Sequence, residues 1–201
     1  MQHKDNVYKS YEKIAGWFDE HRSRELFEKA WLDKALKLLP QNVQVLDLGC
    51  GMGEPIIPYL LKNGAKVTGI DGSTKLIDLA KSRLSEVEFI VSDMRGLELG
   101  RKFDLIIAWH SIFHLSREDQ IGMFATFASH LKQGGALLFT SGEFAGEIWS
   151  DNGGEELYHA SLSPHEYQDL LKQGGFELIE RKISDPECGD ATVWLAKLAE
   201  A

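Results

Sequence analysis

The chain has 201 residues, of which 43% are hydrophobic and 10% are aromatic, so it is long enough to bury a core of its own without a disulfide framework. Its formal net charge of −9 argues against a nucleic-acid substrate, and no apolar run has the length of a signal peptide or a membrane span. The only cysteines, Cys50 and Cys188, are expected to be reduced, which favours a cytoplasmic location.

The first half of the chain alternates between helical and strand patterns. Apolar residues at helical spacing predict a helix over residues 23–40, with Ser23 as its N-cap and Pro40 as its end. Strands are then predicted at residues 43–49, 66–71 and 87–93, separated by helices at residues 56–61 and after Ser73. This alternation predicts a parallel sheet with right-handed crossovers.

The second half continues the alternation and ends differently. A strand is predicted at residues 103–110, a helix from Ser116 to Gly134 and Gly135, and a strand at residues 136–142. A capping box at Ser163 and Glu166, with a proline between them, begins the last helix. Residues 176–184 and 191–198 are separated by too few residues for a crossover, so these two strands are expected to pair antiparallel.

The glycine-rich stretch VLDLGCGMGEP, residues 45–55, is the clearest chemical signal in the sequence. It follows a strand and precedes a helix, which is the context of a nucleotide-binding turn. Glu54 stands where a dinucleotide-binding turn has its third glycine. Asp47 and Glu54 thus place acids on both sides of the loop, which disfavours a pyrophosphate and favours a ligand that carries positive charge.

Residues 47–53, DLGCGMG, together with the later acid Asp71, resemble the D/E-x-G-x-G-x-G signature of the class I S-adenosylmethionine-dependent methyltransferases. The resemblance extends over about residues 40–198. It implies an α/β, Rossmann-like fold with a mostly parallel seven-stranded sheet in the order 3-2-1-4-5-7-6, helices on both faces and a terminal antiparallel hairpin. It also implies S-adenosyl-L-methionine as the cofactor, which leaves as S-adenosyl-L-homocysteine.

The resemblance implies a role for several loop residues. The glycines let the backbone approach the methionine portion of the cofactor, and backbone N–H groups at the helix start receive its carboxylate. Asp47 would hold the amino end and Asp71 the ribose hydroxyls, whereas Asp93 would bind the adenine amino group. The alternatives are a helix cap for Asp71 and a solvated loop acid for Asp93. The expected cofactor site comprises Asp47, Gly49, Cys50, Gly51, Gly53, Ile70, Asp71, Gly72, Asp93, Met94 and Trp109.

Methyl transfer is an in-line displacement, so a base is needed only when the nucleophile arrives protonated. His110, at the end of the fourth strand, is the first candidate for that base, and the alternative is that it only packs beside the cofactor. Glu143 is the second candidate. His110 and His114 have the spacing of a zinc pair, but a third ligand is missing, so no metal is expected.

Two segments outside the common sheet are expected to choose the substrate. Residues 8–21 are rich in aromatic side chains and form part of an N-terminal helical cap, residues 1–40, on a core of residues 41–201. Residues 141–163 are expected to be a long substrate-side loop of a single domain that covers residues 1–201. The alternative for the N-terminal aromatic residues is that they only dock a helix on the sheet. The expected substrate-binding residues are Tyr8, Tyr11, Trp17, His110, His114, Trp149 and Tyr158.

The sequence therefore predicts a methyltransferase that acts on a small molecule, as a monomer or homodimer, without a nucleic-acid or membrane partner. The fourth strand ends in Ala-Trp-His-Ser and lacks the Asn-Pro-Pro-aromatic signature associated with methylation of bases. The main alternative is a non-catalytic protein that binds S-adenosylmethionine as a sensor or partner. An NAD-dependent oxidoreductase is disfavoured by Glu54 and by the glycine spacing.

Overall fold

A seven-stranded sheet in the order β3-β2-β1-β4-β5-β9-β8 is the centre of the computed structural model, which describes residues 6–200. The pairs among β3, β2, β1, β4 and β5 are parallel, whereas β9 pairs antiparallel with both β5 and β8. The sheet strands are β1 (Gln44–Leu48), β2 (Lys66–Asp71), β3 (Glu88–Val91), β4 (Phe103–Ala108), β5 (Leu131–Ser141), β8 (Phe176–Asp185) and β9 (Ala191–Leu198). Counted along the sheet, this is the predicted order 3-2-1-4-5-7-6, so the fold class and the terminal antiparallel hairpin are confirmed.

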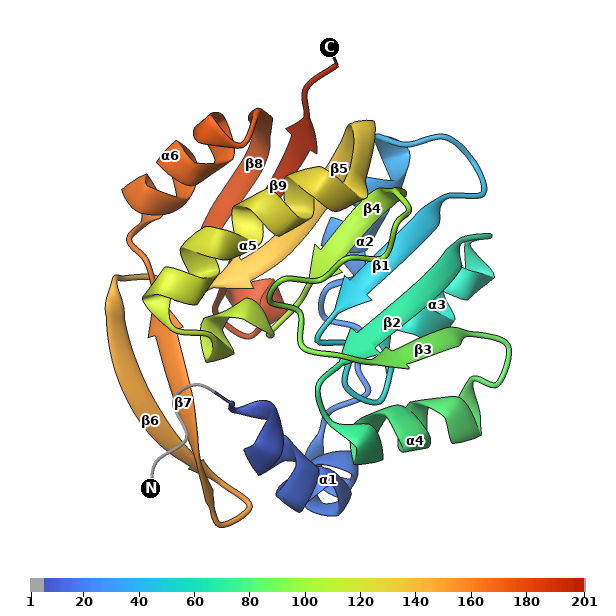
Figure 1. Cartoon of the computed structure of the whole chain (residues 1–201), viewed down its shortest axis with the longest axis vertical. Helices are drawn as coiled ribbons and strands as arrows, with labels where there is room; N and C mark the ends of the chain where they lie inside the picture. Colours follow the sequence, from blue (N-terminus) through green and yellow to red (C-terminus); the bar gives the residue numbers. More distant parts are fainter. Residues whose placement is uncertain (1–5, 201) are drawn as a thin grey trace.

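Helices cover both faces of the sheet (Figure 1). The helices are α1 (Tyr8–His21), α2 (Lys29–Lys37), α3 (Ile56–Lys62), α4 (Thr74–Arg83), α5 (Arg117–His130), α6 (Pro164–Gln173) and the short 3-10 helices η1 (Ile112–His114) and η2 (Pro186–Cys188). Side chains of α2, α3 and α4 form one core cluster with the sheet, and those of α5 and α6 form the other. The central strands are buried on both faces, which explains why residues 103–110 read as a nearly continuous apolar run.

Local capping signals fix several helix starts. The Ser163 side chain accepts from the backbone N–H of Glu166, and the Glu166 side chain accepts from the N–H of Ser163, which is the predicted capping box. Ser73 and Ser116 cap α4 and α5. Because these signals depend only on neighbouring residues, they are readable from the sequence.

Three predicted segments differ in the structure. The helix expected over residues 23–40 is limited to Lys29–Lys37, and Ser23 accepts only a local bond from the N–H of Glu25. The helix after Ser116 ends at His130, because β5 begins at Leu131. Most of the loop expected at residues 141–163 is a hairpin of β6 (Gly146–Asn152) and β7 (Glu155–Ser161), a two-stranded sheet apart from the main one.

The hairpin projects from the edge of the domain toward α1, so segments distant in sequence lie side by side below the sheet (Figure 1). Val7, Ile14, Leu157, Tyr158 and Ala160 form a separate apolar cluster between α1 and the hairpin. The cluster gives the two segments a shared core that is independent of the sheet.

Candidate active site

A cavity of about 210 Å³ lies at the carboxyl ends of β1, β2 and β4. The sheet order changes direction between β1 and β4, and ligands of open α/β sheets bind at such a position. Every residue expected to bind the cofactor lines the cavity, namely Asp47, Gly49, Cys50, Gly51, Gly53, Ile70, Asp71, Gly72, Asp93, Met94 and Trp109. The local sequence pattern therefore identified this part of the cavity.

The glycine-rich loop forms one wall of the cavity. Gly49 has a φ of 74°, and a Cβ atom there would lie 2.3 Å from Cβ of Ser111, so the position requires glycine. The loop N–H groups bond within the protein: Gly49 and Cys50 donate to the carbonyl of Ile70 at 2.7 and 2.9 Å, and Gly53 donates to the carbonyl of Cys50 at 2.9 Å. These three N–H groups are therefore engaged within the protein, whereas binding of the cofactor carboxylate by N–H groups at the start of α3 stays a prediction.

Asp71 holds the glycine-rich loop in place by accepting hydrogen bonds, and its carboxylate can accept further ones. Its Oδ2 accepts from the N–H of Gly51 at 2.9 Å and its Oδ1 from the N–H of Ser73 at 2.8 Å. Burial raises the pKa of Asp71, and these two bonds oppose the rise. Since each carboxylate oxygen accepts two bonds, both oxygens retain a site for a hydroxyl group. The cap of α4 is Ser73, whose Oγ accepts from Leu76.

Asp47 is the acid that the protein leaves open to the cavity. Its side chain is almost buried at 2% exposure, and within residues 6–200 no group donates a hydrogen bond to its carboxylate. Burial, with the charges of Asp71 and Glu28, raises the pKa of Asp47 to about 7, and the charge of Arg22 opposes this. A cationic group in the cavity would relieve the cost of that buried carboxylate.

The other acids of the cavity carry ion pairs. Asp93 accepts from Arg95 at 2.6 Å, and Glu54 lies 3.3 and 3.2 Å from nitrogen atoms of Arg24 and Arg83. Burial raises the pKa of Asp93, but the hydrogen bonds and charge of Arg95 outweigh burial, so the net shift is downward. Of the two acids expected beside the glycine-rich loop, Glu54 is therefore ion-paired, and Asp47 has no ion pair within residues 6–200.

His110 lines the cavity directly after β4. Its backbone N–H donates to Oγ1 of Thr140 at 2.8 Å, and its φ of 49° places it in the left-handed region. Non-glycine residues pay a conformational cost there, and such residues cluster at functional sites. Burial, assisted by the charge of Arg22, lowers the pKa of His110 to about 4, so the imidazole is neutral at physiological pH.

Tyr11 and His114 join α1 to the core across the cavity. The hydroxyl of Tyr11 lies 3.0 Å from Nε2 of His114, and Nδ1 of His114 lies 2.9 Å from the carbonyl oxygen of Tyr158. Because a carbonyl only accepts, His114 carries its proton on Nδ1 and Nε2 accepts from Tyr11. Burial, followed by the charge of His159, lowers the pKa of His114 to about 3.

A group of aromatic and imidazole rings forms the outer part of the cavity. Phe113 packs against His159 with ring centroids 5.3 Å apart, and His159 lies 4.6 Å from His114 by the same measure. Nε2 of His159 lies 2.9 Å from the hydroxyl of Ser150, and Asn152 donates to that hydroxyl. Burial lowers the pKa of His159 as well, so this side of the cavity is lined by neutral rings.

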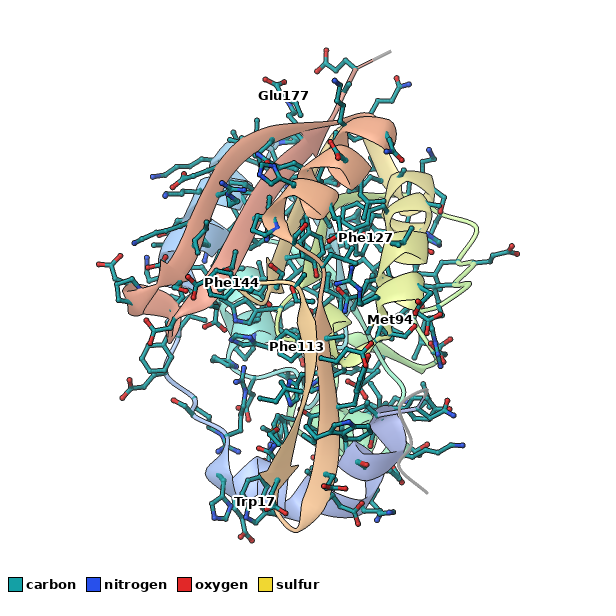
Figure 2. The ribbon with its side chains drawn as sticks, turned by 90° about the vertical axis from the view of Figure 1, so that its left-hand side faces the viewer. Trp17, Met94, Phe113, Phe127, Phe144 and Glu177 are labelled. Atoms are coloured by element: carbon teal, nitrogen blue, oxygen red, sulfur yellow. The ribbon has the colours of Figure 1, made fainter. Side chains whose placement is uncertain are left out.

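Helix α1 and the β6–β7 hairpin cover the cavity together. On one side, Glu12 of α1 accepts from Oγ of Ser73 at 2.6 Å. On the other side, Lys13 lies 2.8 Å from Glu155 of the hairpin. Figure 2 shows Trp17 at the tip of the hairpin and Phe113 behind its middle. A lid built from two segments therefore closes over the rings.

Four predicted residues lie outside the cavity within the described part of the chain: Glu143, Trp17, Trp149 and Tyr158. Glu143 is exposed and accepts from Ser184. Trp17 stacks on His21 and packs against the hairpin turn. Trp149 and Tyr158 are cross-strand neighbours in the apolar cluster that the hairpin shares with α1. Because side chains alternate along β7, the neighbours of Tyr158, Leu157 and His159, line the cavity instead.

The remaining predicted substrate residues, Tyr8, Tyr11, His110 and His114, do line the cavity. The prediction did not include Phe18, Arg22, Phe113, Asn152, Leu157 and His159, which also line it. Strand alternation in residues 155–161 could have identified Leu157 and His159. No sequence signal identifies Arg22, because its position depends on how α1 docks.

Metal binding is not supported by the arrangement of these side chains. Both ring nitrogens of His114 are engaged in hydrogen bonds, so His114 has no lone pair left to bind a cation together with His110. In residues 6–200, no group of three or more His, Cys, Asp or Glu side chains has the geometry to hold a metal ion. No helix in this part of the chain is long and apolar enough to cross a membrane.

Comparison with known proteins agrees with this geometry. Residues 45–135 match the family described as a methyltransferase domain. The chain is 28% identical over 200 residues to a phosphoethanolamine N-methyltransferase of Plasmodium falciparum, covering 92% of this chain and 72% of the relative. It is 30% identical over 101 residues to a dTDP-3-amino-3,4,6-trideoxy-alpha-D-glucopyranose N,N-dimethyltransferase of Streptomyces venezuelae, covering 49% of this chain and 42% of the relative.

Among solved structures, an amino pentose methyltransferase of Micromonospora echinaspora with bound S-adenosylmethionine has a TM-score of 0.73. It shares 16% identity with this chain, and the match covers 92% of this chain and 95% of the other. Such a likeness supports the fold. The matched methyltransferase domain over residues 45–135, the sheet order and the cavity at the glycine-rich loop agree with the resemblance to the class I S-adenosylmethionine-dependent methyltransferases.

Proposed function

We propose that the protein transfers the methyl group of S-adenosylmethionine to a small-molecule acceptor in the cavity at the carboxyl ends of β1, β2 and β4. The observation that carries the proposal is the placement of the open carboxylate of Asp47, the available acceptor sites of Asp71 and the neutral imidazole of His110 in one cavity. These three groups match the amino end, the ribose and the reacting end of one extended ligand.

The chain's own residues fit the cofactor at each end. Asp71 would accept hydrogen bonds from the ribose hydroxyls, and Asp47 would pair with the ammonium group. Met94 and Ile70 line the cavity beside Asp93, which supports an apolar slot for the adenine ring. Bound S-adenosylmethionine supplies an electrophilic methyl group on a sulfonium centre.

His110 is the residue that we propose as the base. It lies at the carboxyl end of β4, and burial keeps its imidazole neutral, so a ring nitrogen is free of a proton at physiological pH. Because this lowered pKa lies far below that of an ammonium group, we expect the imidazole to act on an amine that is already neutral, by accepting a hydrogen bond from its N–H as the new bond forms. Closure of the lid over the bound ligands would exclude water from the same region, which favours displacement over side reactions.

An amine is the acceptor class that we propose to test first. Two observations support it: the relatives reported above act on phosphoethanolamine and on an amino sugar, by their names, and the acceptor side of the cavity holds neutral rings. Neutral rings also tolerate the positive charge of a methylated amine, because aromatic faces attract cations.

The test is transfer of labelled methyl groups from S-adenosylmethionine by the purified protein. The acceptors are a panel of small amines and a cell extract separated into small-molecule, protein and nucleic-acid fractions. We expect label in the small-molecule fraction, and a loss of turnover in His110→Ala with unchanged affinity for S-adenosylhomocysteine. Label in the protein or nucleic-acid fraction alone would contradict the acceptor class, and binding without transfer to any fraction would favour a non-catalytic binder.

The setting that we propose is a reducing cytoplasm, without a nucleic-acid or membrane partner, as a monomer or homodimer. The free thiols of Cys50 and Cys188 and the formal net charge of −9 support this setting. Sedimentation of the purified protein would distinguish a monomer from a dimer.

A further inference from the structure

Arg22 is a cavity residue whose charge has no partner within residues 6–200. The cavity has four acids and two arginines among its lining residues: Asp47, Glu54, Asp71, Asp93, Arg22 and Arg95. Arg95 is bound to Asp93 and Asp119, and Glu54 is held by two arginines outside the cavity lining. Within residues 6–200, Arg22 has no ion pair and no side-chain hydrogen bond, so its guanidinium is available to a ligand.

The end of α1 holds Arg22 at the cavity. Arg22 is the C-cap residue of α1, and its backbone N–H donates to the carbonyl of Phe18 at 2.8 Å. Its side chain is half-buried, and its charge acts on the groups around it, opposing the raised pKa of Asp47 and favouring the lowered pKa of His110. Arg22 therefore lines the same cavity as Asp47 and His110 and is close enough for its charge to act on both.

Four N–H groups of the glycine-rich loop are bonded within the protein and are not available to an anion. The N–H groups of Gly49, Cys50 and Gly53 bond to backbone carbonyls, and the N–H of Gly51 bonds to Asp71. A ligand that places an ammonium group at Asp47 carries, in an amino acid, a carboxylate on the same carbon atom. That carboxylate needs a donor near Asp47 other than these four N–H groups.

We infer that Arg22 binds the methionine carboxylate of S-adenosylmethionine, an assignment that rests on the proposed function. The planar guanidinium donates two parallel hydrogen bonds to a carboxylate, and the interaction is strengthened in a partly buried site. Asp47 and Arg22 then hold the two charges of the amino-acid end separately. The lid consequently carries a cofactor contact, since Arg22 follows α1 directly.

The experiment compares two ligands that differ only in the amino-acid end. S-adenosylhomocysteine has that end, and 5′-methylthioadenosine lacks it, so calorimetric titration of both separates a carboxylate contact from a general loss of binding. Arg22→Gln is expected to weaken binding of S-adenosylhomocysteine roughly 10- to 100-fold, in line with a charge-assisted hydrogen bond. The same substitution should leave the affinity for 5′-methylthioadenosine unchanged.

Two further variants serve as controls. Arg22→Lys retains the charge and is expected to keep part of the affinity lost in Arg22→Gln. Arg101→Gln removes an exposed arginine that pairs with Glu88 outside the cavity, and it should change neither affinity. A similar loss for both ligands in Arg22→Gln would overturn the assignment in favour of a structural role. An unchanged affinity for S-adenosylhomocysteine would also overturn it, and a raised KM for the acceptor would then assign Arg22 to an anionic group of the acceptor. Failure of the wild-type protein to bind either ligand would instead contradict the proposed function.

Discussion

At the scale of single residues, the open carboxylate of Asp47 makes cofactor binding depend on pH. Its pKa is raised to about 7, and only the ionised form pairs with an ammonium group. Affinity for S-adenosylhomocysteine is therefore expected to fall as the pH is lowered, by roughly tenfold from about pH 7.5 to about pH 6. Calorimetric titration across this range measures the slope.

Asp47→Asn should bind more weakly at the upper end of the range and lose the slope. The matched control is Asp93→Asn, which alters a second acid of the same cavity whose pKa is lowered, with burial outweighed by Arg95. That control should keep the slope of the wild type. A slope that persists in Asp47→Asn would assign the titration to another group.

The sequence predicted which residues line the cavity where their positions depend only on neighbouring residues of the chain. The spacing of Asp47, Gly49 and Asp71 is set by one strand, one turn and the next strand, so the sequence alone located these residues correctly in the cavity. Arg22 and Phe113 were not predictable, because a half-buried side chain faces the cavity only after α1 and η1 have docked. Trp149 and Tyr158 were selected for their aromatic character, and the strand alternation turned them away from the cavity.

At the scale of elements, the Tyr11–His114 hydrogen bond fastens the lid to the core. Tyr11→Phe removes this bond, which leaves the apolar contacts of α1 in place. The expected result is a dissociation rate of S-adenosylhomocysteine that rises several-fold, with a melting temperature lowered only slightly, as for the loss of one hydrogen bond worth about 1 kcal/mol. Stopped-flow fluorescence of the tryptophans measures the rate.

Tyr59→Phe is the control for this prediction, because it also removes one phenolic hydroxyl, which donates to Asp33 and belongs to α3 rather than to the lid. It should leave the dissociation rate unchanged. An unchanged rate in Tyr11→Phe would show that the hydrogen bond does not retain the lid.

The hairpin of β6 and β7 carried a sequence signal that the loop prediction overlooked. Its strands are joined by Gly153 and Gly154, both with positive φ, after Asn152. Two such residues between alternating segments are typical of a two-residue β-turn with the twist of a hairpin. The terminal hairpin of β8 and β9 was predictable because its short connection excludes a helical crossover.

At the scale of the whole molecule, two partly buried, neutral histidines make the folded state sensitive to acid. The pKa of His114 falls to about 3 and that of His110 to about 4, whereas both take up protons near pH 6.5 in the unfolded chain. Below about pH 6.5 the unfolded state binds more protons, so each group lowers the free energy of unfolding as the pH falls. The raised pKa values of Asp47 and Asp71 have the opposite effect on the free energy of unfolding, because these groups bind protons more readily in the folded state.

His114→Gln isolates one of these contributions. We expect the substitution to lower the free energy of unfolding by ~2 kcal/mol less at about pH 5 than at about pH 7.5. At the lower pH only the wild type is destabilised by the proton that His114 takes up in the unfolded chain. Chemical denaturation of both proteins at the two pH values measures the difference. An equal loss at both values would mean that His114 is protonated in the folded state.

We propose that the cavity at β1, β2 and β4 binds S-adenosylmethionine through Asp71. The most direct measurement is calorimetric titration of S-adenosylhomocysteine into the wild type and into Asp71→Asn, with Asp169→Asn, which lies outside the cavity, as the control. We expect one site per chain, a loss of affinity of roughly tenfold or more in Asp71→Asn, and no change in the control. Wild-type affinity in Asp71→Asn, or no binding to the wild type, would contradict the claim.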